Sequence, residues 1–397
     1  MAPAPEQSPL PKIKVSTRGA SRLKSGHVWV YRSDITNSDS IPPGSLVAVS
    51  DPRGKVLGTA FYSSSSQIAI RLISHHPVTD LAALIRERIA KAIAYREALV
   101  HDTNAHRIVF SEADFLPGLI VDRYNDVLSV QILTQAMDAA RVRESVISSL
   151  SEHLHPTSIV ERVEPRVRDL ESLPPRASGL LQGEKTATTF TMNAVHFHFD
   201  ALEGQKTGAF LDQRENYAAA ASYAKGDALD VFCYQGGFAL HLAPRCPQVT
   251  GVDSSRPALE VADQNAALNH REIEWIEANA FDLLKDYSSS SRLYDTIVLD
   301  PPAFAKSSRD LDSALRGYKE LNLRALKMLR PAGILVTCSC SYHVSQVSFL
   351  EMLAAAALDA HRTLRLIEVR GQAKDHPVLL NVPETSYLKC VIAFVNN

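Results

Sequence analysis

The sequence predicts an α/β protein whose C-terminal half is a doubly wound, mostly parallel sheet, preceded by a small β-barrel and a central α/β domain. Residues 226–253 have the pattern of a buried strand, a glycine turn, a helix and a second strand ending in Asp253. Further apolar strands follow, each with a helix or loop after it, as far as ILVTCSCS at 334–341. The first 75 residues instead hold short apolar runs between Pro-, Gly- and Ser-rich turns.

Length and composition are those of a soluble globular protein with two or three domains. The chain has 397 residues, of which 45% are hydrophobic and 22% are charged. Residues 1–11 are proline-rich and lack an apolar run, so we expect a disordered tail, with no signal peptide and no membrane span. The five cysteines form no C-x-x-C pair. This argues against a disulfide framework and against a zinc site. We therefore expect no metal, and a reducing, cytoplasmic location.

Residues 12–75 are expected to form the barrel. Its strands are predicted at 28–31, 46–49, 56–61 and 68–73. Residues 1–75 hold nine Lys or Arg against four acids, a charge of +5, whereas the remainder of the chain carries −7. A basic module on an acidic body indicates binding of a polyanion such as RNA. The alternative is a solvated basic face with Trp29 in the core.

Residues 76–190 are expected to form the central domain. An amphipathic helix is predicted over 79–99, a β-meander over 107–133, a helix over 139–154 and a strand over 158–161. The proline-rich and charged stretch 165–187 is predicted to be an exposed loop. Nothing in this region indicates chemistry of its own.

Two features of residues 226–253 predict a nucleoside site. In a βαβ unit the turn after the first strand and the end of the second face one edge of the sheet, so Gly236 and Asp253 should lie together. Paired glycines allow close approach of the backbone to a ligand, and a carboxylate suits ribose hydroxyls. The G-x-G-x-x-G spacing is absent, and Asp230 would repel a diphosphate. A ligand with an amine, S-adenosylmethionine, fits better; the alternatives are NAD or no ligand.

Polar residues on both sides of this unit extend the predicted site. In EGQKTGAFLDQREN, at 203–216, Lys206 could meet a carboxylate and Asp212 an ammonium, although a charged loop before a helix is the alternative. IEANAFD, at 276–282, follows a third strand and suits the adenine edge. Asp300 then ends a strand before Pro301 and Pro302, whose rigid backbone could hold a flat base against Phe304.

Together these motifs resemble a known family. GQKTGAFLDQREN, DVFCYQGGFALHLA, GVDSS, LDPPAFAKS, RGYKELN, PAGILVTCSCS, KDHPV and YLK resemble the bacterial ribosomal RNA large subunit methyltransferase I family, over nearly the whole chain after residue 12. The resemblance implies a Rossmann-like class I methyltransferase domain over 191–397. The barrel resembles the RNA-binding PUA domain at Gly26, His27, Trp29, Tyr31, Gly44, Asp51, Gly54 and Gly58.

The resemblance also implies roles for residues around S-adenosylmethionine. The methionyl side is expected to contact Lys206, Thr207, Gly208, Phe210 and Asp212, with Asp230, Phe232 and Gly236 beneath it. Asp253 is expected at the ribose, and Asn279 and Ala280 at the adenine, with Ser254 also in contact with the cofactor. Gln235 stands where the family usually has Thr, and Asn279 where it usually has Asp. The Asn carbonyl can still accept from the adenine amino group, so cofactor binding should be weakened at most.

The activity implied by the resemblance is methylation of carbon 5 of a cytosine in 23S ribosomal RNA. A cysteine thiolate must first add to carbon 6 of the base. Cys338 and Cys340 share a strand face, but Cys340 is nearer the carboxyl end, and similar enzymes have the nucleophile seven residues after the glycine that opens this strand, here Gly333. Asp300 is the candidate for proton transfer near N3. The alternatives are methylation of a guanine nitrogen (N2 or N7) and a noncatalytic RNA-binding factor; a homodimer is left open, and no membrane partner is expected.

Overall fold

The protein, described here by a computed structural model, divides into two compact units. The structure describes residues 10–37, 40–202, 209–290, 292–305 and 307–396. The first unit comprises the described residues of 1–188, 199–208 and 375–385, and the second those of 189–198, 209–374 and 386–397. The hairpin of β12 (Ala187–Met192) and β13 (Val195–Asp200) has residues 189–198 in the second unit, whereas the residues before and after them belong to the first. In the part of the chain that the structure describes, no helix is long and apolar enough to cross a membrane.

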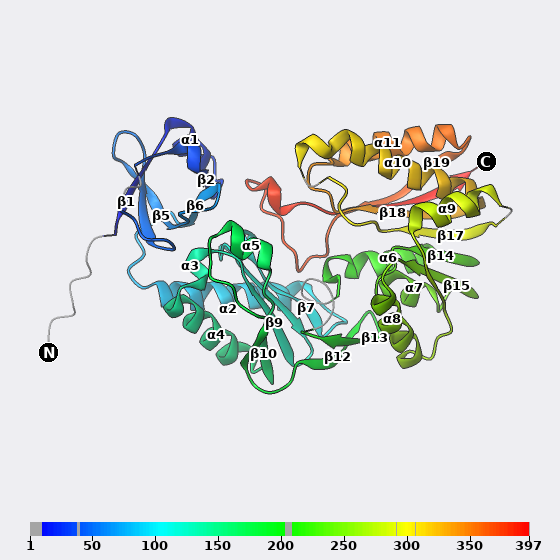
Figure 1. Ribbon diagram of the computed structural model, residues 1–397, viewed down its shortest axis with the longest axis horizontal. Coiled ribbons are helices and arrows are strands. Elements are labelled where there is room, and N and C mark those ends of the chain that lie inside the picture. The colour runs from blue at the N-terminus through cyan, green and yellow to red at the C-terminus, as the bar shows by residue number, and fades with distance from the viewer. Residues whose placement is uncertain (1–9, 38–39, 203–208, 291, 306, 397) are drawn as a thin grey trace. The chain divides into compact units, whose positions relative to one another are not determined.

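The predicted barrel is a six-stranded mixed sheet in the described chain, with the order β2-β6-β5-β4-β1-β3 (Figure 1). The four predicted strands are present, but β1, β3 and the helix α1 were not predicted. Asp51 is buried and accepts from the backbone N–H groups of Arg53 and Lys55, both at 3.0 Å, which holds the β4–β5 turn. The elements are β1 (Lys12–Val15), α1 (Thr17–Lys24), β2 (Trp29–Tyr31), β3 (Ile35–Asn37), β4 (Leu46–Ser50), β5 (Val56–Tyr62) and β6 (Ile68–Ser74).

The central region forms a five-stranded sheet, within the described residues, with the order β11-β10-β9-β8-β7. Apolar side chains of α2 and α4 pack on it in a core that also takes in Phe61 and Ile73 of the barrel strands. The elements are α2 (Leu81–Leu99), β7 (Ala105–Phe110), β8 (Leu119–Tyr124), β9 (Val127–Ile132), α3 (Gln135–Asp138), α4 (Ala140–Leu154), β10 (Ser158–Glu161), α5 (Pro165–Leu170) and β11 (Gly179–Gln182).

The prediction that 165–187 is a loop was wrong. This stretch forms α5 and the edge strand β11, and two of its charged residues are buried. Glu171 accepts from the hydroxyl of Ser63 at 2.8 Å and from the guanidinium of Arg71 at 3.2 Å. Buried charges are tolerated when they are paired in this way, so the partners that keep Glu171 inside are provided by strands about 100 residues away in the chain.

A segment from the C-terminal part of the chain completes the first unit. Residues 375–385, between β19 and β20, belong to it. Val382 is fully buried in the barrel core, and Asp375 accepts from the backbone N–H of Arg107 at 2.8 Å. His27 also lies 3.0 Å from a carboxylate oxygen of Glu384. The barrel core therefore depends on residues more than 300 positions away in the sequence.

The second unit is the predicted doubly wound sheet. Its described residues form seven strands in the order β16-β15-β14-β17-β18-β20-β19, with β20 antiparallel to both neighbours. Figure 1 shows α9, α10 and α11 over one face of the sheet and α6, α7 and α8 over the other. The elements are α6 (Arg214–Tyr223), β14 (Asp227–Val231), α7 (Gly237–Leu242), β15 (Gln248–Asp253), α8 (Arg256–Leu268), β16 (Glu274–Glu277), α9 (Ala280–Ser289), β17 (Tyr294–Leu299), α10 (Leu311–Met328), β18 (Leu329–Ser339), α11 (Gln346–Asp359), β19 (Thr363–Arg370) and β20 (Lys389–Asn396).

The strand order reverses between β14 and β17. From β14 the sheet runs through β15 to β16 on one side, and through β17 to β18 on the other. Ligands of open α/β sheets bind outside the carboxyl ends of the strands at such a reversal. The glycine turn after β14 and Asp300 after β17 both lie at this point, so the sheet brings the two predicted halves of the site to one edge.

Candidate active site

The turn after β14 is a tight loop in which several residues adopt a left-handed backbone. Phe232 (φ 69°), Tyr234 (φ 48°) and Gly236 (φ 84°) all have positive φ. The N–H groups of Phe232 and Cys233 both donate to the carbonyl oxygen of Val252, at 2.8 and 3.0 Å. A Cβ at Gly236 would come within 2.9 Å of the Trp275 ring, so both conformation and space favour glycine there.

Asp253 ends β15 and is connected to this turn. One of its carboxylate oxygens accepts from the N–H of Tyr234 at 2.9 Å, and the other from the N–H of Ser255 at 2.8 Å. An ionised carboxylate has about four acceptor positions, so each oxygen keeps capacity for a further donor such as a ribose hydroxyl. Ser254, the neighbouring predicted residue, is exposed.

Three carboxyl groups interact by charge with the buried Tyr217. Burial raises the pKa of Tyr217 well above its usual value, and the nearby charges of Asp300, Asp212 and Asp230 raise it further. Asp230 is itself buried, and one of its oxygens accepts from the N–H of Ala239 at 2.9 Å. Burial, opposed by this hydrogen bond and reinforced by Asp300 and Asp253, raises the pKa of Asp230 to about 8.

This arrangement fits a cationic ligand. The second oxygen of Asp230 is buried and has no hydrogen-bond partner among the residues that the structure describes. A buried polar atom without a partner is costly. A ligand ammonium group could donate a hydrogen bond to this oxygen, and its positive charge would favour the ionised form of Asp230. The residues present therefore suit S-adenosylmethionine better than a dinucleotide.

Asp300 and Asp212 are held by residues for which the sequence predicts no role. The Gln213 amide donates to Asp300 at 3.0 Å, and Asn216 donates to the Gln213 carbonyl oxygen at 2.7 Å. The hydroxyl of Tyr387 donates to Asp212 at 2.7 Å. Gln213 lies next to Asp212 in the EGQKTGAFLDQREN motif. Asp300 is 87 residues further along the chain, so no local sequence pattern indicates their contact.

Asn279 caps α9. Its side-chain oxygen accepts from the backbone N–H groups of Phe281 at 2.9 Å and Asp282 at 3.4 Å. The oxygen expected to accept from the adenine amino group thus already takes two donors, and the amide NH₂ is the group left for a ligand. Ala280, the other residue expected at the adenine, is buried in the first turn of α9.

Cys340 lies just past the carboxyl end of β18, which ends at Ser339. It is partly exposed, and its Sγ atom is 4.0 Å from the carbonyl oxygen of Pro301. Cys338 is fully buried opposite Cys390 of β20. Burial raises the pKa of the Cys338 thiol well above its usual value, so Cys338 is poorly suited to act as a nucleophile.

The loop after β17 is fastened near Cys340. Pro301 is buried and Pro302 is exposed. Phe304 is partly buried, with its ring centroid 4.7 Å from that of Tyr318 and 5.9 Å from that of Phe281. Phe304 thus packs on neighbouring rings.

Among the predicted cofactor residues, Phe210 packs edge-on against Tyr234, with 5.2 Å between the ring centroids. Lys206, Thr207 and Gly208 lie outside the described residues.

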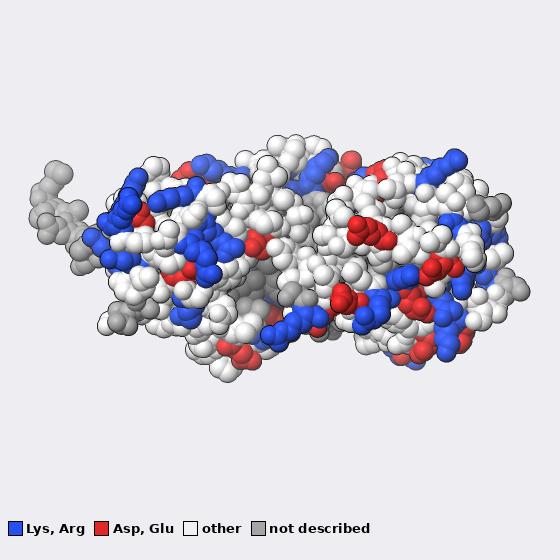
Figure 2. Space-filling view, turned by 90° about the horizontal axis from the view of Figure 1, so that it is seen from above, with Lys and Arg blue, Asp and Glu red and all other residues white. Residues whose placement is uncertain are grey.

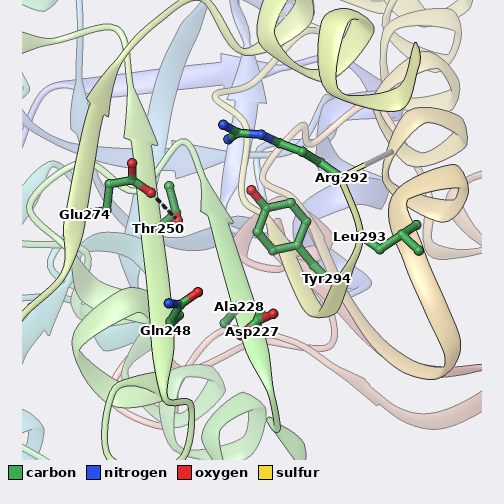
Figure 3. Close-up of a pocket in the computed structure, with 8 residues that line it drawn as sticks. All are labelled: Asp227, Ala228, Gln248, Thr250, Glu274, Arg292, Leu293 and Tyr294. Carbon is green, nitrogen blue, oxygen red and sulfur yellow. Dashed lines mark hydrogen bonds between the residues drawn. The ribbon is translucent and has the colours of Figure 1, made fainter. Parts of the chain in front are cut away.

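A pocket of about 220 Å³ lies at the opposite edge of the same sheet. Figure 3 shows that Asp227, Gln248, Glu274 and Tyr294, which begin β14, β15, β16 and β17, line it together with Arg292. It is therefore at the amino ends of the strands, where ligands of open α/β sheets do not bind. We assign it no part in the candidate site.

The fold and the acidic edge at the strand reversal define a class I S-adenosylmethionine-dependent methyltransferase. The family model described as "S-adenosylmethionine-dependent methyltransferase" matches residues 163–379, and that of a PUA-like domain matches 13–75. The chain belongs to the ribosomal RNA large subunit methyltransferase I family. It is 38% identical to the protein of that name from Shewanella amazonensis, over 97% of this chain and 99% of the relative, and 39% identical to that from Tolumonas auensis, over 92% and 94%.

Solved structures share the fold. A Streptococcus mutans protein described as an S-adenosylmethionine-dependent methyltransferase has a TM-score of 0.82 and 19% identity, over 97% of this chain and 100% of that one. A second structure, of a methyltransferase complexed with SAH, has a TM-score of 0.83 with the same coverage and identity. These structures confirm the fold class inferred from the sequence, and the family model and the relatives confirm the resemblance and the cofactor.

Proposed function

We propose that this S-adenosylmethionine-dependent methyltransferase of large subunit ribosomal RNA methylates carbon 5 of a cytosine in 23S rRNA, with Cys340 as the nucleophile. The observation that supports this most is the thiol of Cys340. It is partly exposed past the end of β18, 4.0 Å from the Pro301 carbonyl oxygen that follows Asp300. Methylation of a guanine nitrogen needs no thiol at this position.

The chemistry requires a nucleophile beneath an unstacked base. The Cys340 thiolate adds to carbon 6, forming the S–C6 bond, and the electrons of the C5–C6 double bond move to carbon 5, which becomes nucleophilic. S-adenosylmethionine, when bound, supplies the methyl group as an electrophile. A base then removes the proton from carbon 5, the double bond forms again, and the thiolate leaves carbon 6. The cytosine must be single-stranded or flipped to reach the site.

Asp300 is proposed to exchange a proton near N3 of the cytosine. Gln213 orients it by donating to one carboxylate oxygen at 3.0 Å, and Asn216 in turn holds Gln213. A protonated or hydrogen-bonded N3 draws electrons from the ring and so favours addition at carbon 6. Asp212, Asp230 and Asp253 are proposed to hold the cofactor on the other side of the strand reversal.

The barrel is proposed to bind rRNA. Figure 2 shows Lys and Arg side chains gathered over the barrel at the left, with few acids among them. Asp34 and Asp51, the acids of the described barrel, are buried, whereas its exposed cations are Lys12, Lys14, Arg18, Lys24, Arg53 and Lys55. Arg18 and Lys24 pair with Asp34 and Asp51, at 2.9 and 3.2 Å. The other four cations remain for contacts with a phosphate backbone. The five unpaired cysteines are consistent with a reducing cytoplasm.

The test compares Cys340→Ala with Cys338→Ala. The first variant should lose methyl transfer to 23S rRNA but keep its affinity for S-adenosylmethionine, and the second should keep most activity. RNA with 5-fluorocytidine should trap the wild type covalently at Cys340, because fluorine cannot leave as the proton does. Mass spectrometry of nucleosides identifies the product. Full activity in Cys340→Ala would exclude the thiol mechanism and favour a guanine nitrogen as the acceptor.

A further inference from the structure

Lys389 lies beside Cys340 although the two are far apart in the sequence. It is the first residue of β20, and its backbone pairs with that of Ser339, the last residue of β18 and the neighbour of Cys340. The residue is only 7% exposed. A lysine this deeply buried is uncommon in a folded protein unless a partner keeps it there.

The Lys389 ammonium holds the backbone next to Cys340. It donates to the carbonyl oxygen of Ser341 at 2.6 Å and to that of Tyr387 at 2.8 Å. Ser341 is held on its other side as well, because its hydroxyl accepts from the N–H of Ala305 at 3.2 Å and hydrogen-bonds the Tyr318 hydroxyl at 2.9 Å. Residue 341 is therefore tied to β20, to α10 and to the loop after Asp300.

The ammonium also interacts with the Cys340 sulfur by charge. Burial lowers the pKa of Lys389 to about 8, and the Cys340 thiolate opposes that effect. Its two hydrogen-bond acceptors are carbonyl oxygens, which carry no net charge. At neutral pH the amine is largely protonated, so a positive charge lies at the carbonyl oxygen of Ser341, the residue after Cys340.

We propose that Lys389 is a positioning residue for the candidate nucleophile: its buried ammonium stabilises Cys340 as a thiolate and orients the backbone that carries it. The inference rests on the role of Cys340 proposed above. The proton of the thiol leaves to solvent, and no further reactant is needed. Lys389 thus prepares the sulfur for addition without touching the base.

Other titratable groups lie near this end of β18. Tyr318 of α10 interacts with Cys340 by charge. Asp300, after β17, and Cys390, on β20, interact with Cys338, two residues before Cys340 on β18. Asp300 disfavours ionisation of the Cys338 thiol, and Lys389 is the cation among these groups. Removing Lys389 should therefore raise the pH at which the Cys340 thiol ionises.

The experiment measures alkylation of Cys340 by iodoacetamide across neutral and mildly alkaline pH in the full-length protein, without RNA or cofactor, with mass spectrometry to assign the modified cysteine. A positive charge a few ångströms away lowers a pKa by about 1 to 3. Lys389→Met should therefore slow alkylation of Cys340 about tenfold or more near neutral pH. It should also raise the pH at which the alkylation rate is half its maximum. Lys389→Arg, which keeps the charge, should restore much of the rate. Lys225→Met is the matched control, since that exposed amine lies over Phe394 on the same strand, away from Cys340.

An unchanged pH profile in Lys389→Met would overturn the proposal. The wild type gives a second measure if that variant does not fold, because a midpoint at or above about 8.5, the ordinary thiol value, would also overturn it. Failure of the proposed function has a different signature. In that case 5-fluorocytidine RNA forms no adduct at Cys340, whatever the alkylation profile shows.

Discussion

Replacing Asn279 with Asp is expected to tighten the binding of S-adenosylmethionine. The Asn279 oxygen accepts from the N–H groups of Phe281 and Asp282 and so caps α9. The remaining amide NH₂ is a donor, and the adenine amino group is also a donor, so the two cannot pair. An Asp could cap the helix with one oxygen and accept from the adenine with the other.

The size of the effect follows from these contacts. A hydrogen bond to a charged group contributes about 1.5 to 3 kcal/mol. Residue 279 is exposed, so the lower end applies, and about 1.5 kcal/mol corresponds to a roughly tenfold lower dissociation constant. A negative charge at a helix N-terminus should also add about 0.3 to 1 kcal/mol to stability, reduced here by Asp282 in the same turn.

Titration calorimetry with S-adenosylmethionine and thermal unfolding without it separate the two effects. Asn279→Ser is the matched control, because Ser is also a good cap but presents no second acceptor, and it should bind the cofactor as the wild type does. Should Asn279→Asp gain stability without gaining affinity, adenine does not lie against residue 279, and the reasoning is refuted.

Three further outcomes are expected. Asp253→Ala should weaken binding of S-adenosylmethionine by about 1.5 to 3 kcal/mol, the range for a charged hydrogen bond; unaltered affinity in calorimetry would mean that the ribose does not lie at the end of β15. Burial raises the pKa of Asp230 to about 8, so the stability that this group contributes is complete below about pH 4 and is lost as the pH rises through about 8. Melting of the cofactor-free protein between about pH 5 and 8 should therefore depend less on pH in Asp230→Asn than in the wild type, and equal dependence would contradict the burial argument. Replacing Lys12, Lys14 and Lys55 with Ala should weaken rRNA binding and lower the slope of its salt dependence by about one for each phosphate that is no longer neutralised. The same change at the exposed Arg271, Lys285 and Lys327 should do neither. Equal losses of affinity in both triple variants would exclude the barrel as the specific RNA-binding surface.

Two strands of the methyltransferase sheet were missed in the sequence for a physical reason. β19 and β20 pair antiparallel, but residues 371–388 separate them. The short turn that signals a hairpin is absent. That intervening segment is partly incorporated into the barrel core through Val382, an interaction that no local pattern can indicate. The stretch 165–187 was misjudged similarly, because its charges are buried by partners distant in sequence.

What the sequence by itself determined is the edge of the sheet at which the site lies. Short, continuous apolar runs locate β14, β15 and β17. The direction of parallel strands brings the residues that follow them, among them Gly236, Asp253 and Asp300, to one edge. Composition likewise identified the barrel as the basic part of the chain.

Only the tertiary structure decided which atoms are available at that edge. The pairing of β18 with β20 brings Lys389 beside Cys340, the hydrogen bond from Gln213 orients Asp300, and the cap of α9 occupies the oxygen of Asn279. The first two contacts join residues distant in the sequence, whereas the cap is local and depends on where α9 begins. Residue type and spacing limit what a side chain can do, but its neighbours in space decide which of its donors and acceptors remain for a ligand.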